Sequence, residues 1–291
     1  MLWGSPVDKN VKFSFSMILL AGFLGCGSKP LPDLLIKPIS ELPKALNEAS
    51  GLALIDDVLW SLNDSGNDPV VYGLSFSGDF IAAVTVLNAE NVDWESLAQD
   101  REYLYIADTG NNFNTRDEFI IYRVPIPKVS QSTVTAEPIF LHYADHQAGS
   151  SYSHNYDAEA LAVRDEELWL FTKNRGDGKT NLYRFPKLPG NYSLERSQTL
   201  PVNSLVTAAD INIDSGELVL LSNEGAGFGT GTRVWWAPTS DDGVDWDKSY
   251  SVSIGPTDQW EAVAWVDLDQ LLLTHEKSRQ GFPGLALLRK H

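Results

Sequence analysis

Hydrophobic and polar positions recur five times along the chain in the same order. Each copy opens with a run of small apolar residues, continues about ten residues later with an apolar strand core, and ends in a polar loop rich in Asn, Asp and Gly. The opening runs are residues 50–53, 95–98, 159–162, 209–212 and 261–264, and the strand cores are residues 59–64, 104–108, 168–172, 218–222 and 271–275. A repeat of this length indicates a repeat architecture.

The copies are separated by 45, 64, 50 and 52 residues, a spacing that suits one four-stranded propeller blade per repeat. Further runs of β-branched, aromatic and apolar residues follow each pair of strands, as strands prefer. The third strands are predicted at residues 70–74, 119–124, 181–185, 233–236 and 285–288, and fourth strands at residues 81–87, 139–143, 197–202 and 250–254. The fifth copy has no fourth strand of its own before His291.

An apolar run at residues 34–39 precedes the first repeat and has no partner nearby. If it supplies the missing strand of the last blade, the ring closes and no sheet edge stays open. We therefore predict an all-β fold over residues 34–291, a single β-propeller with five blades of four antiparallel strands. Six blades are the alternative, because the 64-residue interval has room for a degenerate element. A β-sandwich is a further alternative, because it also has short, regularly spaced strands. Residues 40–49 have room for one short helix.

The composition fits one packed domain and an acidic surface. The chain has 291 residues, 43% of them hydrophobic, with nine Trp. Its net charge of -17 repels phosphate backbones, which excludes nucleic acid as an expected partner and is compatible with cationic ligands. Solubility alone is an equally simple reason for so much negative charge. We expect a monomer.

The N-terminal segment predicts export and lipidation. Lys9 and Lys12 precede an apolar stretch at residues 13–24 that is too short to span a bilayer as a helix. Residues 23–26 resemble a bacterial lipobox that ends at Cys26, the only cysteine in the chain. We expect a signal peptide at residues 1–25, a lipidated Cys26 with a tether over residues 26–33, and an envelope protein. Gly27 in place of Asp favours the outer membrane.

The predicted blade topology brings polar residues to one face. The first two strands of a blade are antiparallel, so the start of the first and the end of the second lie together. These positions are rich in carboxylates and amides, and convergent polar groups in a concavity are the default binding site. The candidate ligand-binding residues are Asp64, Asp93, Asp108, Asn112, Asp157, Lys173, Asn223 and His275.

Three copies open with a glutamate, Glu95, Glu159 and Glu261, whereas Ser50 and Ala209 hold this position in the other two. If these glutamates point into the channel mouth they are candidate metal ligands and catalytic carboxylates, since oxygen ligands suit Ca²⁺ or Mg²⁺. The alternative is that each glutamate caps the backbone of the next blade. Neighbouring Trp94, Tyr156 and Trp260 either stack on a sugar or cation at the rim or pack between blades.

The Glu-Ala-Leu-Ala run at residues 159–162, followed by Leu-Trp-Leu at residues 168–170, resembles exported bacterial propellers of the phytase-like and gluconolactonase-like group. Residues 91–95 and 108–112 are similar to uncharacterised secreted members. The resemblance implies calcium at the channel mouth, with Glu95, Glu159, Asn223 and Glu261 at matching positions, and water activated for hydrolysis of phosphoesters or lactones. Two hypotheses follow: a tethered propeller that binds a ligand or envelope partner, or a calcium-dependent hydrolase.

Overall fold

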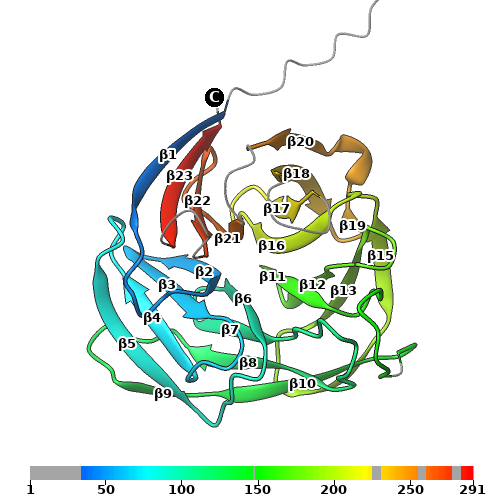
Figure 1. Ribbon diagram of the computed structural model, residues 1–291, viewed down its shortest axis with the longest axis horizontal. Coiled ribbons are helices and arrows are strands. Elements are labelled where there is room, and N and C mark those ends of the chain that lie inside the picture. Colours follow the sequence, from blue (N-terminus) through cyan, green and yellow to red (C-terminus); the bar gives the residue numbers. More distant parts are fainter. Residues whose placement is uncertain (1–33, 147, 225–230, 255–259, 277–282, 291) are drawn as a thin grey trace, which may run out of the picture. The chain divides into compact units, whose positions relative to one another are not determined.

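The computed structural model describes residues 34–146, 148–224, 231–254, 260–276 and 283–290. All of them belong to one compact unit, residues 31–291. They form five small sheets arranged around a ring as the blades of a β-propeller, in which each chain segment of about four strands makes one blade (Figure 1). This confirms the predicted five-bladed all-β fold. No helix in this described part of the chain has the length and hydropathy needed to cross a bilayer.

Each of the first three blades is built from strands in chain order, from the centre of the ring outward. Blade 1 contains β2 (Ala49–Ile55), β3 (Val58–Asn63), β4 (Val70–Leu74) and β5 (Phe80–Leu87). Blade 2 contains β6 (Trp94–Gln99), β7 (Tyr103–Asp108), β8 (Phe119–Pro125) and β10 (Glu137–Tyr143). Blade 3 contains β11 (Ala158–Arg164), β12 (Glu167–Thr172), β13 (Thr180–Pro186) and β15 (Arg196–Leu200).

The last two blades differ at their outer edges. Blade 4 contains β16 (Leu205–Ile211), β17 (Glu217–Asn223) and β18 (Thr232–Ser240), and β18 pairs with both the short β19 (Gly243–Val244) and β20 (Tyr250–Ser253). A single 3₁₀ turn, η1 (Trp246–Lys248), lies between those two strands. Blade 5 contains β21 (Trp260–Trp265), β22 (Gln270–His275), β23 (Gly284–Lys290) and β1 (Leu34–Glu41).

The N-terminal strand closes the ring as predicted. β1 pairs antiparallel with β23, from Leu34 opposite Lys290 to Glu41 opposite Gly284, so the two ends of the described chain share one blade (Figure 1). The hydrogen bonds between them take the place of a covalent closure and cover the edge that β23 would otherwise expose.

Two short strands join neighbouring blades in a way that the repeat did not predict. β9 (Thr133–Thr135) lies between β8 and β10 in the chain, yet it pairs in parallel with β5 of blade 1. β14 (Gly190–Leu194) lies between β13 and β15 and pairs in parallel with β10 of blade 2. Each connection therefore reaches back and covers the outer edge of the preceding blade, which leaves fewer unpaired backbone groups.

The helix considered for residues 40–49 was wrong. This segment forms turns after β1, with Leu46 N–H donating to the Pro43 carbonyl at 2.8 Å. The Asn63 amide donates to the Ala45 carbonyl at 2.7 Å. Leu42 and Leu46 are buried, so tertiary contacts hold their side chains without a helix.

The hydrophobic core lies between the blades. Five clusters of buried apolar residues each combine side chains of two adjacent blades. The fifth cluster joins blade 5 to blade 1, so the core is continuous around the ring. The largest fully buried side chains include Trp60, Trp94, Trp169 and Trp236. Each buried large apolar side chain contributes about 1.5–3 kcal/mol. At Gly51, a Cβ would come within 2.8 Å of the Leu97 nitrogen, so this glycine lets β2 approach β6.

Candidate functional site

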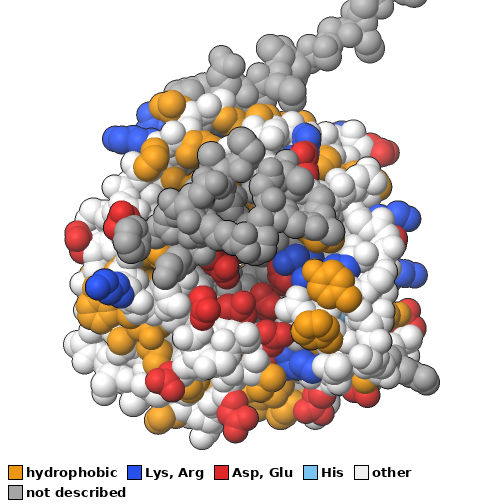
Figure 2. Space-filling model, viewed as in Figure 1, with side chains coloured by type: hydrophobic (Ala, Val, Ile, Leu, Met, Phe, Trp, Pro, Cys, Tyr) orange, Lys and Arg blue, Asp and Glu red, His pale blue; other side chains and the backbone are white. Residues whose placement is uncertain are grey.

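Each central strand contains a β-bulge near its start. The pairing of each central strand with its neighbour skips one residue at this point. The skipped residues are Ser50, Glu95, Glu159, Thr207 and Glu261. A bulge redirects a side chain that would otherwise alternate with the sheet. All five residues line one cavity of about 180 Å³ at the centre of the ring, together with Asp64, Asn112, Lys173 and Glu276. On this face, acidic side chains gather in a hollow (Figure 2).

The fourth repeat was aligned two residues too late in the sequence. Thr207, not Ala209, is the bulged residue of β16 and lines the cavity. Residues 209–212 contain the small apolar and acidic residues that the pattern requires, but they lie further along the strand. The other four copies contain the same bulge and were placed correctly, so the error came from the resemblance of residues 209–212 to an opening run.

The two bulged hydroxyl residues have an architectural role. Ser50 Oγ donates to the Trp94 carbonyl at 3.1 Å, and Thr207 Oγ1 donates to the Trp260 carbonyl at 3.0 Å. Each bond joins the central strand of one blade to the next blade around the ring. An ionised glutamate cannot donate such a bond. The alternative in which each glutamate caps the next blade therefore describes what Ser50 and Thr207 do.

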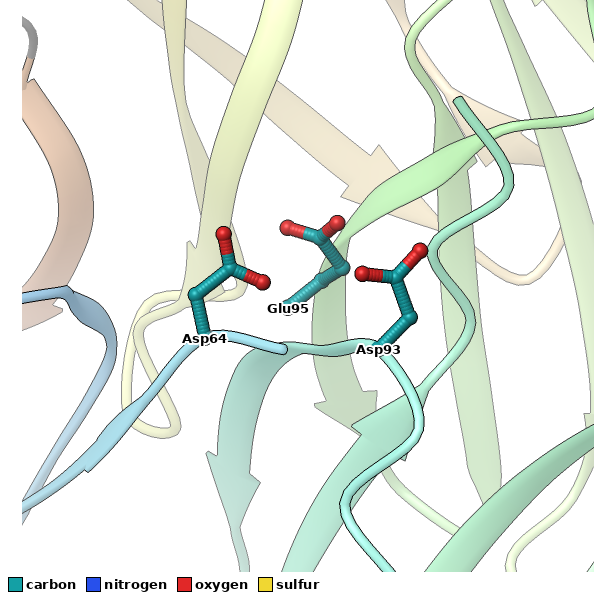
Figure 3. A group of neighbouring side chains, drawn as sticks. All are labelled: Asp64, Asp93 and Glu95. Carbon is teal, nitrogen blue, oxygen red and sulfur yellow. The ribbon is translucent and has the colours of Figure 1, made fainter. Parts of the chain in front are cut away.

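The first group of carboxylates, which we call the unpaired cluster, consists of Asp64, Asp93 and Glu95. Each supplies one oxygen, and the three oxygens lie within 4.8 Å of one another. Figure 3 shows the carboxylates turned toward a common space, with Asp64 from the loop after β3, Asp93 from the residue before β6 and Glu95 from the start of β6. Glu95 is only 7% exposed. In the described part of the chain, no hydrogen bond or ion pair reaches the carboxylate of Glu95 or Asp93.

Gly110 makes room for the unpaired cluster. A Cβ at this position would come within 2.3 Å of the Asp93 carboxyl carbon and 2.5 Å of Glu95 Oε1. The Gly110 N–H donates to the Asp93 carbonyl at 3.2 Å. The backbone of the loop after β7 therefore contacts the two carboxylates directly, and only glycine permits this approach.

The second group, which we call the paired cluster, consists of Asp157 and Glu159 with Lys173 and Arg175. Lys173 forms an ion pair with Glu159, and Arg175 forms one with Asp157. Arg175 also lies 3.6 Å from Glu159 Oε1 and donates to Asn112 Oδ1 at 2.6 Å. One oxygen each of Asp157, Glu159 and Glu95 lies within 4.8 Å of the others. The two clusters thus meet at Glu95, but only one of them contains its own cations.

Burial and mutual repulsion raise the pKa values of the cavity carboxylates. Burial is the largest cause for Glu95, whose pKa is raised well above its usual value, and the charge of Glu159 adds to it. Burial also raises the pKa of Asp93 and of Glu276 to about 7, and that of Glu261 well above its usual value. The pKa of Lys173 is raised because the charges of Glu159 and Glu261 outweigh burial. The cavity therefore favours added positive charge, whether protons or a cation.

The structure brings together many of the residues that the sequence nominated. Those that line the cavity or belong to its two clusters are Asp64, Asp93, Glu95, Asn112, Asp157, Glu159, Lys173 and Glu261. Ser50, Thr207 and Glu276 also line the cavity but were not nominated as site residues from the sequence. Asp64, Lys173 and Glu276 each directly follow the second strand of a blade, after β3, β12 and β22. This shared position is the signal that could have identified Glu276 as a site residue.

Three nominated residues neither line the cavity nor belong to either cluster. Asp108 is fully buried, accepts a hydrogen bond from Asp93 N–H at 3.1 Å and pairs with Arg116 at 2.8 Å, so it supports the loop that carries Asp93. Asn223 accepts a hydrogen bond from Thr232 Oγ1 at 2.8 Å. His275 contacts the Trp260 ring edge-on, with ring centroids 5.0 Å apart.

Two of the aromatic residues considered for the rim pack inside the protein instead, and the third, Tyr156, is half-buried against the cluster between blades 2 and 3. Trp94 is fully buried, Trp260 is 6% exposed, and Tyr156 contacts Tyr143 and His146. Cys26 and the segments at residues 1–25 and 26–33 lie outside the described residues.

No protein-family model and no curated protein matches the chain. Solved structures with a related arrangement include a hydrazine synthase chain from Kuenenia stuttgartiensis, at 12% identity over 81% of this chain and 58% of that chain, with a TM-score of 0.45. Another is the calcium-binding protein regucalcin from Agrobacterium tumefaciens, at 12% identity over 87% of this chain and 92% of that chain, with a TM-score of 0.43.

A third similar structure is an exo-β-1,3-galactanase from Phanerochaete chrysosporium, at 10% identity over 89% of this chain and 64% of that chain, with a TM-score of 0.53. The chain spans less than two thirds of the hydrazine synthase and galactanase chains. At such identities the likeness to the galactanase shows the fold alone, and function has to be argued from the site.

Proposed function

We propose that this protein is an exported, lipid-anchored β-propeller that binds a divalent cation, Ca²⁺ above all, at the unpaired cluster, and uses this charged mouth to bind a ligand or envelope partner. The observation that carries the proposal is Glu95. The residue is 7% exposed and lines the cavity, and its carboxylate has no hydrogen bond or ion pair in the described part of the chain. A buried charge without a partner costs several kcal/mol, and a bound cation removes this cost.

The donor set fits a hard cation. Asp64, Asp93 and Glu95 offer only oxygen atoms, which Ca²⁺ and Mg²⁺ prefer over zinc or copper. Calcium takes oxygen ligands at about 2.3–2.6 Å, so two of its ligands lie no more than about 5 Å apart. Three oxygens within 4.8 Å of one another satisfy this limit. Six to eight ligands are usual for calcium, which leaves places for water and for oxygens of a ligand.

Calcium should therefore stabilise the protein against heat. A ligand that binds only the folded state at about 100 times its Kd adds about 2.7 kcal/mol, which raises the Tm of a protein of this size by several degrees. The full chain would be heated in EDTA, in CaCl₂ and in MgCl₂, beside D93N. We expect a calcium-dependent rise in Tm for the wild type and little or none for D93N. Equal Tm values of the wild type in EDTA and CaCl₂ would contradict the proposal.

The anchor is tested separately. We expect acyl chains on Cys26 by mass spectrometry of the protein purified from membranes, and we expect the C26S variant to leave the membrane fraction. Recovery of unmodified wild-type protein in the soluble fraction would contradict this part of the proposal while leaving the cation site untouched.

One observation favours the hydrolase as a second candidate. Burial raises the pKa of Glu159 to about 7, the range of a general base at neutral pH, and Glu159 lies beside the unpaired cluster. When bound there, a divalent cation supplies Lewis-acid activation of a phosphoester or lactone. Glu159 is placed to take a proton from the attacking water. Turnover of a phosphoester and lactone panel that falls about 10²–10⁴-fold in E159Q would support hydrolysis, and no turnover by the wild type would leave binding as the function.

A further inference from the structure

The unpaired and paired clusters are two neighbouring oxygen sites that share one carboxylate. Asp64, Asp93 and Glu95 form the first set of oxygens, and Glu95, Asp157 and Glu159 form the second, each within 4.8 Å. The shared residue, Glu95, is 7% exposed and has no hydrogen bond of its own in the described ranges. A carboxylate shared between adjacent sites is the arrangement that two-metal centres use to hold ions about 3.5–4 Å apart.

The second set already contains a cation, supplied by the chain. Lys173 Nζ forms an ion pair with Glu159, and only 15% of the lysine side chain is exposed. Its ammonium group is a compact point charge with three donors, so it can occupy a place among oxygens as a metal ion does. Arg175, two residues after Lys173 in the same loop, forms an ion pair with Asp157.

The blade repeat shows what Lys173 replaces. The residue directly after the second strand is Asp64 in blade 1 and Glu276 in blade 5, and both line the cavity. In blade 3 the same place holds Lys173, which lines the cavity as well. Blade 3 thus puts a positive charge where blades 1 and 5 put a carboxylate that lines the cavity, and this charge lies beside the second group of carboxylates found among the described residues.

We infer that the channel mouth is a two-cation site in which a divalent metal ion binds the unpaired cluster and the Lys173 ammonium fills the second position. Lys173 therefore limits the protein to one metal ion. This inference rests on the proposed function, and it assigns to the carboxylates of Glu159 and Glu95 a latent second site for Ca²⁺. Because Glu159 pairs with Lys173, it lies beside the metal ion without being one of the metal ligands.

Calorimetric titration of Ca²⁺ into the full chain, freed of metal by a chelator, tests the inference. We expect about one ion per chain for the wild type and about two for K173M, because methionine fills the volume of the lysine stem without its charge. K173R retains a cation and should bind about one ion. K179M, which removes an exposed lysine after the same loop, is the matched control and should also bind about one.

The outcomes separate the two proposals. One ion for both the wild type and K173M would overturn the inference about Lys173 and leave the proposed function intact. No ion for either protein would overturn both. If K173M does not fold in EDTA, its circular dichroism is followed during refolding in CaCl₂. Recovery of the β-sheet spectrum with calcium supports a metal ion in place of the ammonium, and failure to refold in either solution overturns it.

Discussion

The two carboxylate clusters at the channel mouth contain the same kinds of groups but are balanced in opposite ways. Asp157 and Glu159 lie beside Arg175 and Lys173, which pair with them directly. Asp64 and Asp93 lie on the other side of Glu95, and no ion pair reaches either of them in the described part of the chain. We infer from this difference that the position of the counter-ions, and not the number of acidic groups, decides where an external cation is expected to bind.

A second contrast runs around the ring. Five bulges aim five side chains at one cavity, but Ser50 and Thr207 donate hydrogen bonds to the adjacent blade. Glu95, Glu159 and Glu261 occupy equivalent places, and among the described residues they make no such bond. The same backbone feature therefore supports the ring in two blades and presents charge in three. Substitutions that neutralise one charge or one hydroxyl should separate these roles.

The largest effect should come from removing a counter-ion of the paired cluster. R175M leaves Asp157, which is fully buried, without its guanidinium partner. Breaking a buried ion pair from one side costs about 3–5 kcal/mol. We expect a loss of this size in the free energy of unfolding, measured by urea denaturation at neutral pH in EDTA. R101M is the control, because Arg101 is exposed and belongs neither to the cavity lining nor to the two clusters. An R175M protein as stable as R101M would contradict the difference between the clusters.

A somewhat smaller effect is expected from the shared carboxylate. E95Q removes the charge that lies between the clusters, so calcium affinity should fall by about a hundredfold, ~2.7 kcal/mol. Competition with a fluorescent chelator measures the change, and E118Q, at an exposed glutamate that does not line the cavity, should bind as the wild type does. Unchanged affinity in E95Q would move the cation away from the unpaired cluster.

The metal-free protein should lose stability as the pH rises. Burial, followed by the charge of Asp64, raises the pKa of Asp93 from 3.8 to about 7, so the folded state binds this proton more tightly than the unfolded state. The stability that protonated Asp93 contributes is therefore fully present below about pH 4 and is lost as the pH rises through about 7. We expect a loss of roughly 1–3 kcal/mol between pH 5 and pH 8 in EDTA, since one pKa unit is worth about 1.4 kcal/mol.

Two comparisons sharpen this pH dependence. D93N, which cannot ionise, should show a flatter profile of unfolding free energy against pH in EDTA. Calcium should flatten the wild-type profile as well, because the cation takes the place of the protons. A wild-type protein that becomes more stable toward pH 8 without calcium would show that the carboxylates are already neutralised by other groups.

The smallest effect is expected at a bulged hydroxyl. S50A removes the hydrogen bond to the Trp94 carbonyl and should cost about 1 kcal/mol of unfolding free energy. Calcium affinity should stay within about twofold of the wild type, because Ser50 supports the ring and belongs to neither cluster. A large loss of calcium affinity in S50A would erase the distinction between architectural and charged bulges.

The sequence predicted the ring because its signals are local. The runs of β-branched, aromatic and apolar residues, the period of the repeat and the apolar run at residues 34–39 were enough to place five blades and their closure, and β1 does pair with β23. The strands β9 and β14 were not predicted because they pair with a preceding blade, and such pairings leave no local pattern.

The site was predictable in part, and its charge balance was not. Glu95, Glu159 and Glu261 could be nominated because they open equivalent strands. Thr207 was missed because residues 209–212 also resemble an opening run, which placed the fourth copy two residues too late. The pairing of Lys173 with Glu159 could not be read from spacing, since it depends on where a side chain from one loop ends relative to the neighbouring strand.

The most direct test of the cation site is an anomalous-difference map from crystals of the full chain grown with Tb³⁺, which replaces Ca²⁺ at oxygen sites. The unpaired cluster should bind the ion, so the map should contain one strong peak within bonding distance of the carboxylates of Asp64, Asp93 and Glu95. A map without a peak there, or with its main peak outside the channel mouth, would contradict the assignment.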